Sequence, residues 1–248
     1  MKTLLAKDRS IRKFRSEPIA PEVLQDMLEG ASRASTCGNM QLYSLIVTQS
    51  RELREALAPC HFNQPMVTQA PCVITVCADV HRFSMWCEQR DAEPCYDNFA
   101  WFLNGVTDAL LAAQNLCVEA EAHGLGICYL GTTIYTAEEI ARILDLPKGV
   151  IPVTTIVVGH PDESPELTDR LPLDAVVHCE KYHHYTSSEI DELWAEKETS
   201  EETRRLLEEN GLPNLAQIFT RNRYRAEDNL AISRNYFALL KKQGFFNN

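Results

Sequence analysis

The sequence predicts an α+β fold, in which buried strands and amphipathic helices share a core. The run at 72–78 is almost continuously apolar and rich in β-branched side chains, as buried strands are. At 97–123, apolar side chains recur at helical spacing over roughly 40 Å. From residue 187 the chain becomes strongly charged and helical in pattern. We therefore expect a core at 1–186 and a C-terminal helical excursion at 187–248 that packs on the core or on a partner subunit.

The first part of the chain alternates between helices and strands. We expect a short helix at 2–8 and a helix at about 21–34, whose first turn suits Pro21. A strand at 45–47 follows. A short helix at 50–58 then begins at a serine N-cap and leads to the buried strand described above.

The second part begins with the long helix. Asp97 or Asn98 can cap its first turn, and Gly124 can end it. A helix this long and apolar lies at the centre of a core or in an oligomer interface. The remaining expected elements are a short strand up to Leu130, a helix at 136–144, a strand at 153–158 and a last helix at 228–243 that Gly244 ends.

Charge and composition exclude several classes of protein. The chain carries 24 Lys and Arg against 35 Asp and Glu, a net charge of −11. Such a surface does not suit a general binder of nucleic acid or of anionic membranes. The N-terminus lacks the apolar region of a signal peptide, and no apolar run is long enough for a membrane span. The nine cysteines include no Cys-x-x-Cys pair, so we expect a cytoplasmic protein.

The sequence does not match the known glycine-rich nucleotide-binding motifs or the known zinc-binding motifs. After Gly124 and Gly126, a dinucleotide-binding fingerprint needs a third glycine where Tyr129 stands. A phosphate-binding P-loop needs a lysine where Thr132 stands. The histidines do not have the spacing of zinc ligands, so we expect no metal.

The basic segment at 8–15 is the strongest candidate for a ligand site. It packs four cations and a hydroxyl just after the first expected helix. Taken alone, it fits a solvated basic turn. It also suits an anionic ligand, because the arginine fork matches phosphate oxygens and clustered arginine is unusual in so acidic a chain.

Further segments follow the basic one in a fixed order over nearly the whole chain. They are DRSIRKFRSEPI, RASTCGNMQLYSLIVT, APCVITVCAD, AAQNLCVEAEAHGLGICYLG, LPKGVIPVTTIVVGHPDE, RLPLDAVVH and YFALLKKQGFF. In this order they resemble the FMN-dependent nitroreductase family, and most closely its oxygen-insensitive nitroreductases and NADPH–flavin oxidoreductases. The resemblance implies a mixed, mainly antiparallel sheet flanked by helices, in an intertwined homodimer with FMN at the interface.

The resemblance also implies residues that bind the cofactor. Arg9 and Ser10 would meet the FMN phosphate and ribityl chain, and Arg12 would lie at the pyrimidine end of the flavin. The other implied contacts are Thr36, Cys37, Gly38, Asn39 and Gln41 along the flavin, in part from the partner subunit, Gln64 near the ring, the backbone of Tyr129, Leu130 and Gly131 at its edge, and Arg170 at the phosphate. The chain departs from the family at Leu167 or Thr168, where a lysine is common, and at Thr132, where a glycine is common.

The chemistry of the residues agrees with this assignment. Reduced flavin carries negative charge at its pyrimidine end, so a cation such as Arg12 favours hydride uptake. Gly131 leaves room at the other edge and offers a backbone N–H. Because the cofactor performs the redox chemistry, we expect no catalytic acid, base or nucleophile. We interpret Cys37 as lining the site and Asp108 as part of the polar stripe of the long helix.

A second basic cluster lies in the excursion. If the chain is extended there, the alternating Arg221, Arg223 and Arg225 point to one side and suit the 2′-phosphate of NADPH. The alternative is a surface turn that balances nearby acids.

These inferences predict an NAD(P)H-dependent oxidoreductase with FMN. A ping-pong reaction would pass hydride from NADPH or NADH through FMN to a small-molecule acceptor, either a nitroaromatic, a quinone or a flavin. Two alternatives are a different flavin reaction on the same fold and a non-catalytic flavin-binding or regulatory protein. NADPH oxidation with and without an acceptor separates them.

Overall fold

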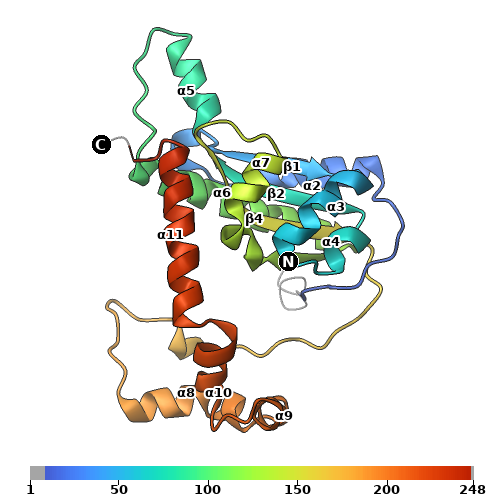
Figure 1. Ribbon diagram of the computed structural model, residues 1–248, viewed down its shortest axis with the longest axis vertical. Coiled ribbons are helices and arrows are strands. Elements are labelled where there is room, and N and C mark those ends of the chain that lie inside the picture. Colours follow the sequence, from blue (N-terminus) through green and yellow to red (C-terminus); the bar gives the residue numbers. More distant parts are fainter. Residues whose placement is uncertain (1–8, 247–248) are drawn as a thin grey trace. The chain divides into compact units, whose positions relative to one another are not determined.

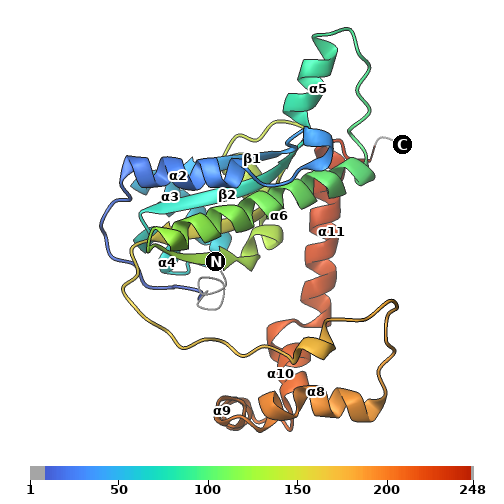
Figure 2. The ribbon, with the colours of Figure 1, turned by 180° about the vertical axis from the view of Figure 1, so that it is seen from behind.

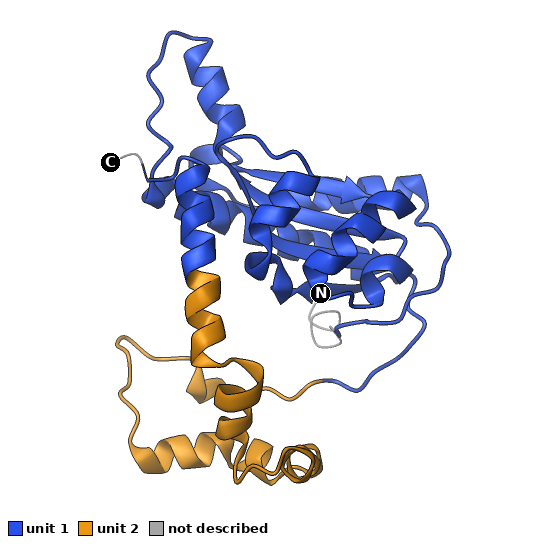
Figure 3. Ribbon diagram, in the orientation of Figure 1, with its two compact units in different colours: residues 1–167, 234–248 blue, residues 168–233 orange. Residues whose placement is uncertain are grey.

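The computed structural model describes residues 9–246, so the helix expected at 2–8 lies outside the described residues. The chain divides into two compact units, Met1–Leu167 with Arg234–Asn248, and Thr168–Ser233 (Figure 3). The sequence analysis divided the chain between residues 186 and 187, and it assigned the last residues to the excursion. The division into an FMN-binding core and an excursion stays a prediction.

The first unit is built on a four-stranded sheet with the strand order β1-β2-β4-β3 (Figure 1). The strands are β1 (Tyr43–Thr48), β2 (Cys72–Asp79), β3 (Gly126–Leu130) and β4 (Val150–Gly159). Each neighbouring pair is antiparallel, and an isolated parallel bridge joins Ser10 to Ile127 at the β3 edge. The α+β fold and the mainly antiparallel sheet are therefore confirmed.

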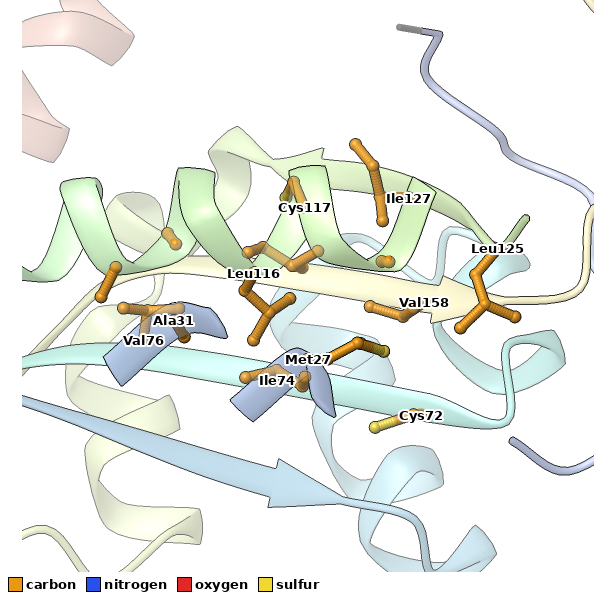
Figure 4. Close-up of a cluster of buried hydrophobic side chains, with 14 of the residues drawn as sticks. Met27, Ala31, Cys72, Ile74, Val76, Leu116, Cys117, Leu125, Ile127 and Val158 are labelled. Carbon is orange, nitrogen blue, oxygen red and sulfur yellow. The ribbon is translucent and has the colours of Figure 1, made fainter. Parts of the chain in front are cut away.

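One face of the sheet packs against two helices, α2 (Pro21–Ser32) and α6 (Phe99–Ala122) (Figure 2). Met27 and Ala31 of α2 meet Leu116 and Cys117 of α6 above strand residues such as Ile74 (Figure 4). As expected, the Asn98 side chain caps α6 by accepting a hydrogen bond from the Trp101 amide. This face holds the largest apolar cluster of the described residues.

The opposite face is covered by shorter elements and by the N-terminal segment. The elements are α3 (Arg51–Leu57), η2 (Ala58–His61), α4 (Met66–Gln69), η3 (Gly131–Tyr135) and α7 (Ala137–Ile143). Ile11 and Phe14 pack here against Val73, Cys128 and Val157 of the sheet. Every residue of β2 is buried, because both faces are covered, which accounts for its unbroken apolar sequence.

Several elements flank this core. The short 3₁₀ turn η1 (Cys37–Asn39) precedes β1, and α5 (His81–Glu88), which the sequence analysis did not predict, follows β2. The last helix, α11 (Ala226–Lys242), begins in the second unit and ends in the first, where Leu239 and Leu240 are buried. Gly244 follows it at a φ of +91°.

The second unit contains short helices. They are η4 (Leu173–Ala175), α8 (Ser187–Thr199), α9 (Glu201–Asn210), α10 (Leu215–Ile218) and the π-helix η5 (Phe219–Arg223). A capping box starts α8: the Thr186 hydroxyl accepts from the Glu189 amide, and the Glu189 carboxylate accepts from the Thr186 amide. Across the part of the chain that the structure describes, no helix is long and apolar enough to cross a membrane.

Candidate functional site

The basic segment predicted from the sequence forms an N-terminal arm, residues 9–15, along the edge of β3. The Ile11 amide donates to the Ile127 carbonyl at 2.8 Å, and the Arg15 amide donates to the His160 carbonyl at 2.9 Å. One carboxylate oxygen of Glu163 accepts from two further arm amides, those of Arg12 and Lys13. The arm is therefore a fixed part of the first unit rather than a loose basic turn.

Two glycines allow the arm to approach the sheet this closely. A Cβ on Gly126 would lie 2.6 Å from Cγ1 of Ile11, and one on Gly159 would meet the ring of Pro71 and lie 3.1 Å from Cδ1 of Phe14. Real Cβ atoms do not approach other heavy atoms so closely. Glycine at these positions thus lets the arm seat its apolar residues while Arg12, Lys13 and Arg15 stay exposed.

Arg9 lies at the start of β3, where it lines a pocket of about 290 Å³ together with Gly124, Gly126 and Ser164. Its Nη1 donates to the Ser164 hydroxyl at 3.2 Å. Its Nε is buried and has no hydrogen-bond partner among the described residues. A buried, unpaired guanidinium N–H is a group that a phosphate oxygen would satisfy, so this end of the site fits the phosphate of FMN. The same pocket includes Glu163, whose Oε1 the arm amides already occupy.

Ser10 and Arg12 reach the same edge of β3. Burial raises the pKa of the Cys128 thiol, while the positive charge of Arg12 and a hydrogen bond with Ser10 oppose that rise. Ser10 also forms an isolated parallel bridge with Ile127, the residue before Cys128 in β3. Arg9, Ser10 and Arg12 thus lie on one arm along β3, and their contacts with FMN stay predictions.

The far end of β3 supplies the next predicted contacts. Leu130 is buried, and the Tyr129 hydroxyl lies 3.5 Å from Oε1 of Gln114, so neither side chain projects beyond the strand end. Gly131 follows, and apart from its chain neighbours no heavy atom of the described residues lies within 4 Å of the place where its Cβ would stand. This open space suits the approach of a flat ring to the backbone.

Gln64 lies in the turn after η2, where its backbone amide donates to the backbone carbonyl of His61 at 3.1 Å. The same His61 lies 2.8 Å, through its Nδ1, from the hydroxyl oxygen of Thr132. Because Thr132 directly follows Gly131, the turn that carries Gln64 and the end of β3 are neighbours. Gln64 and Gly131, both predicted to contact the flavin ring, therefore lie in neighbouring segments.

The predicted flavin-lining residues Thr36, Cys37, Gly38, Asn39 and Gln41 form a separate loop before β1. Its backbone is unusual: Gly38, Asn39 and Gln41 have φ values of 54°, 56° and 55°. Non-glycine residues in this left-handed region are strained unless their surroundings hold them.

Asp108 holds this loop from the middle of α6. Its carboxylate accepts from the Cys37 amide at 2.9 Å and from the Leu42 amide at 3.0 Å, and the residue is only 1% exposed. On the other side of the loop, Arg82 donates to the backbone carbonyl of Gln41. The prediction that Asp108 lies on a polar stripe is wrong, because its oxygens satisfy two buried backbone donors.

The loop and Gly131 do not meet within one chain. The loop precedes β1 and Gly131 follows β3, and these strands form the two edges of the sheet. Both lie at the same end of the sheet, but three strand spacings separate them by roughly 14 Å. One protomer thus carries two separate parts of the predicted flavin site.

The remaining predicted residues lie in the second unit. Arg170 donates from Nη1 to the Thr168 hydroxyl at 2.6 Å and lines a cavity of about 660 Å³ with Trp194, Leu215 and others. Its phosphate contact stays a prediction.

The second arginine cluster does not have the expected extended backbone. Arg221 and Arg223 lie in the π-helix η5, and helical residues two apart do not share a face. Arg223 lies over the ring of Phe219, 5.4 Å from its centroid. Arg225 pairs with Asp228 at 2.7 Å. The expectation that the three arginines align on an extended turn is therefore wrong, and their contact with NADPH stays a prediction without that support.

Sequence reasoning missed three residues that build this site. Asp108 was detectable, since it lies three residues after Gly105 and four before Ala112, on the buried face of α6. Glu163 and His61 carried no sequence signal, because their partners come from distant parts of the chain.

Comparison with known proteins matches the fold and the site to one family. The model of the nitroreductase family matches residues 5–160. The chain belongs to the nitroreductase family. The family recognised from the sequence is therefore confirmed.

Relatives in this family cover most or all of the chain. An NADPH-dependent oxidoreductase of Staphylococcus aureus (strain USA300) is 35% identical over 184 residues, 73% of each chain. A crystal structure of a putative oxidoreductase from Bacteroides fragilis NCTC 9343 has a TM-score of 0.97 at 48% identity and covers 99% of this chain and 100% of its own. The NADPH:FMN oxidoreductase of Vibrio harveyi, solved with NAD⁺, has a TM-score of 0.82 at 25% identity and covers 100% and 99%.

Proposed function

We propose that this nitroreductase oxidises NADPH or NADH and passes the electrons to a nitroaromatic, quinone or flavin acceptor in two separate half-reactions. The coarser part of this function follows from family membership: the chain is an NAD(P)H-dependent oxidoreductase with FMN as its cofactor, as predicted. The ping-pong order, the acceptors and the cytoplasmic location remain predictions.

The observation that supports the proposal is the arrangement along β3. The unpaired N–H of Arg9 lies at the start of the strand, Ser10 forms a bridge with Ile127 of the strand, and the open backbone of Gly131 lies at its end. The Arg9 N–H suits a phosphate and the open Gly131 backbone suits a flat ring, so one extended cofactor can contact both ends of β3.

The chain's own residues bind and orient the cofactor in this proposal. Arg9 would hold the phosphate, and Arg12 would place a positive charge at the pyrimidine end. When bound there, FMN takes up hydride from the nicotinamide donor and gives the electrons to the acceptor. The Gly131 backbone would leave the ring edge open and offer its N–H.

We extend the proposal to a homodimer, because each protomer carries the loop at 36–42 on the sheet edge opposite Gly131. A second copy could place its loop beside the first copy's β3 edge. Helix α6 has exposed apolar side chains that a partner would cover: Phe99, Leu103, Leu110 and Leu111, each between 41% and 48% exposed. Light scattering at micromolar protein concentration tests this, and a stable FMN-loaded monomer contradicts it.

Gly131→Ala is the most direct test of the FMN position. The new methyl group meets no atom among residues 9–246 beyond its chain neighbours, so the urea midpoint of the apoprotein should not change. If the flavin ring lies against this backbone, the methyl group should cost about 1–3 kcal/mol of binding, or roughly 5- to 150-fold in Kd. Unchanged FMN affinity would remove the ring from this position.

Turnover separates the proposed enzyme from a flavin-binding protein without activity. NADPH oxidation should accelerate when a nitroaromatic or quinone is added to the FMN-loaded protein. Bound FMN that NADPH does not reduce, with or without an acceptor, would favour a binding or regulatory role.

A further inference from the structure

His61 is a buried polar residue that the proposed function does not use. It ends η2 and is completely buried, with 0% of its surface exposed. Its Nδ1 lies 2.8 Å from the hydroxyl oxygen of Thr132, and its Nε2 has no hydrogen-bond partner among the described residues. A buried polar atom without a partner is costly, so its position calls for an explanation.

The imidazole of His61 is neutral in the folded protein. Burial lowers its pKa to about 4, from the usual value near 6.5. A neutral imidazole has one N–H and one acceptor nitrogen, and the Thr132 hydroxyl can complement either state of Nδ1. The hydrogen bond to Thr132 therefore forms in either tautomer.

Two hydrogen bonds tie η2 to the segment that follows β3. Besides the contact between His61 and Thr132, the Thr136 hydroxyl donates to the Cys60 carbonyl at 2.7 Å. The first bond lies directly beside Gly131. The second lies one helical turn further along the chain, and its hydroxyl reaches the Thr132 carbonyl only at 3.5 Å, so the first bond acts more directly on the backbone at the ring end of the site.

His61 also reaches the site through its backbone, because its carbonyl accepts from the amide of Gln64. The two segments predicted to contact the flavin ring thus meet at His61, one at its imidazole and the other at its backbone carbonyl.

We propose that His61, through Thr132, is a positioning residue for the FMN site: it fixes the backbone N–H of Gly131 and the turn of Gln64 relative to each other. The proposal rests on the proposed function in one respect, namely that the flavin ring contacts Gly131. It does not require His61 to touch the cofactor or to transfer a proton.

The test compares three threonine variants in the FMN-loaded protein. Thr132→Val removes the hydroxyl at nearly constant shape, Thr132→Ser retains it, and Thr136→Val is the matched control that breaks the other bond between the same segments. FMN Kd, the visible circular dichroism of bound FMN and its reduction potential are the readouts. Thr132→Val should weaken FMN binding about 2- to 10-fold and alter the flavin spectrum. Thr132→Ser should restore both, and Thr136→Val should leave both near wild type.

A second pair of variants keeps the test decisive if Thr132→Val does not fold. His61→Asn places an amide where Nδ1 stands and should retain the bond to Thr132, whereas His61→Gln places its amide near Nε2 and should lose it. The proposal predicts wild-type FMN affinity and spectrum for His61→Asn and altered values for His61→Gln.

The outcomes separate this proposal from the proposed function. If Gly131→Ala weakens FMN binding while Thr132→Val and His61→Gln change stability alone, His61 is structural and the proposal fails. If Gly131→Ala leaves FMN affinity unchanged, the ring position itself is wrong.

Discussion

The carboxylate of Asp108 should stabilise both the fold and the flavin loop, and Asp108→Asn tests this at nearly constant shape. In the native protein its two oxygens accept from the Cys37 and Leu42 amides, and the group is buried. In the variant, one oxygen becomes an NH₂ group that faces a backbone N–H, so one donor is left without an acceptor.

The magnitude follows from these contacts. A hydrogen bond to a charged group contributes about 1.5–3 kcal/mol, and an unsatisfied buried donor costs about 1–3 kcal/mol. Because the variant keeps one neutral bond, we expect the free energy of unfolding to fall by about 3 kcal/mol. With an m-value of about 3 kcal/mol per M, the urea midpoint should fall by about 1 M.

The assay is urea unfolding of the apoprotein at one fixed protein concentration, since a dimer's stability depends on concentration. Thr68→Ala is the control: Thr68 lies in α4, away from the exposed face of α6, it is exposed, and the printed hydrogen bond of its hydroxyl goes to the Pro65 carbonyl three residues earlier. We expect it to lie within about 0.5 kcal/mol of wild type. An equally small change for Asp108→Asn would show that its carboxylate does not stabilise the fold. FMN affinity should fall as well, because the loop at 36–42 is predicted to line the flavin.

Three further predictions follow from the first unit. Burial lowers the pKa of His61 to about 4 in the folded protein. Between about pH 6.5 and pH 4 the unfolded chain therefore binds a proton at His61 that the folded chain does not bind. The free energy of unfolding should fall by about 3 kcal/mol as the pH drops across this range. Urea midpoints across that window should show this slope, and His61→Asn should flatten it; an equal slope in both proteins contradicts the assignment. Gly126→Ala places a Cβ 2.6 Å from Cγ1 of Ile11, so it should displace the arm, lower the free energy of unfolding by about 1–3 kcal/mol and weaken FMN binding. Urea unfolding and FMN titration measure the two effects. If neither the urea midpoint nor the FMN Kd changes, the arm can shift freely. Arg9→Ala should weaken FMN binding roughly 10- to 150-fold, as equilibrium titration measures. The control is Arg51→Ala, which removes an exposed arginine bonded to Glu55 and should leave FMN affinity unchanged. Equal FMN affinities for the two variants would reject the phosphate contact of Arg9.

Elements with a strong apolar pattern were predictable from the sequence. The run at 72–78 became β2 and the periodic segment at 97–123 became α6, because burial on a fixed face requires such patterns. Helix α5 was missed, since it has only eight residues, so its apolar residues Phe83, Trp86 and Cys87 have too few turns in which to repeat. The extended turn expected at 221–225 is a π-helix in part, because alternating arginines alone do not determine the backbone.

The candidate site was predictable where a short segment carries its own chemistry. The arm supplied Arg9, Ser10 and Arg12 together, and the structure keeps them at one strand. Its anchor, Glu163, lies 151 residues from Arg12 in sequence, so only the folded chain reveals it. Long-range partners of this kind leave no local pattern.

FMN bound along β3 should carry electrons in two separate steps. Anaerobic titration of the FMN-loaded protein with NADPH, followed by addition of a quinone or nitroaromatic, measures both steps. NADPH alone should remove the visible flavin absorbance, and the acceptor should restore it after NADP⁺ has been washed away. If the flavin absorbance stays unchanged until the acceptor is also present, FMN does not carry electrons in two separate steps.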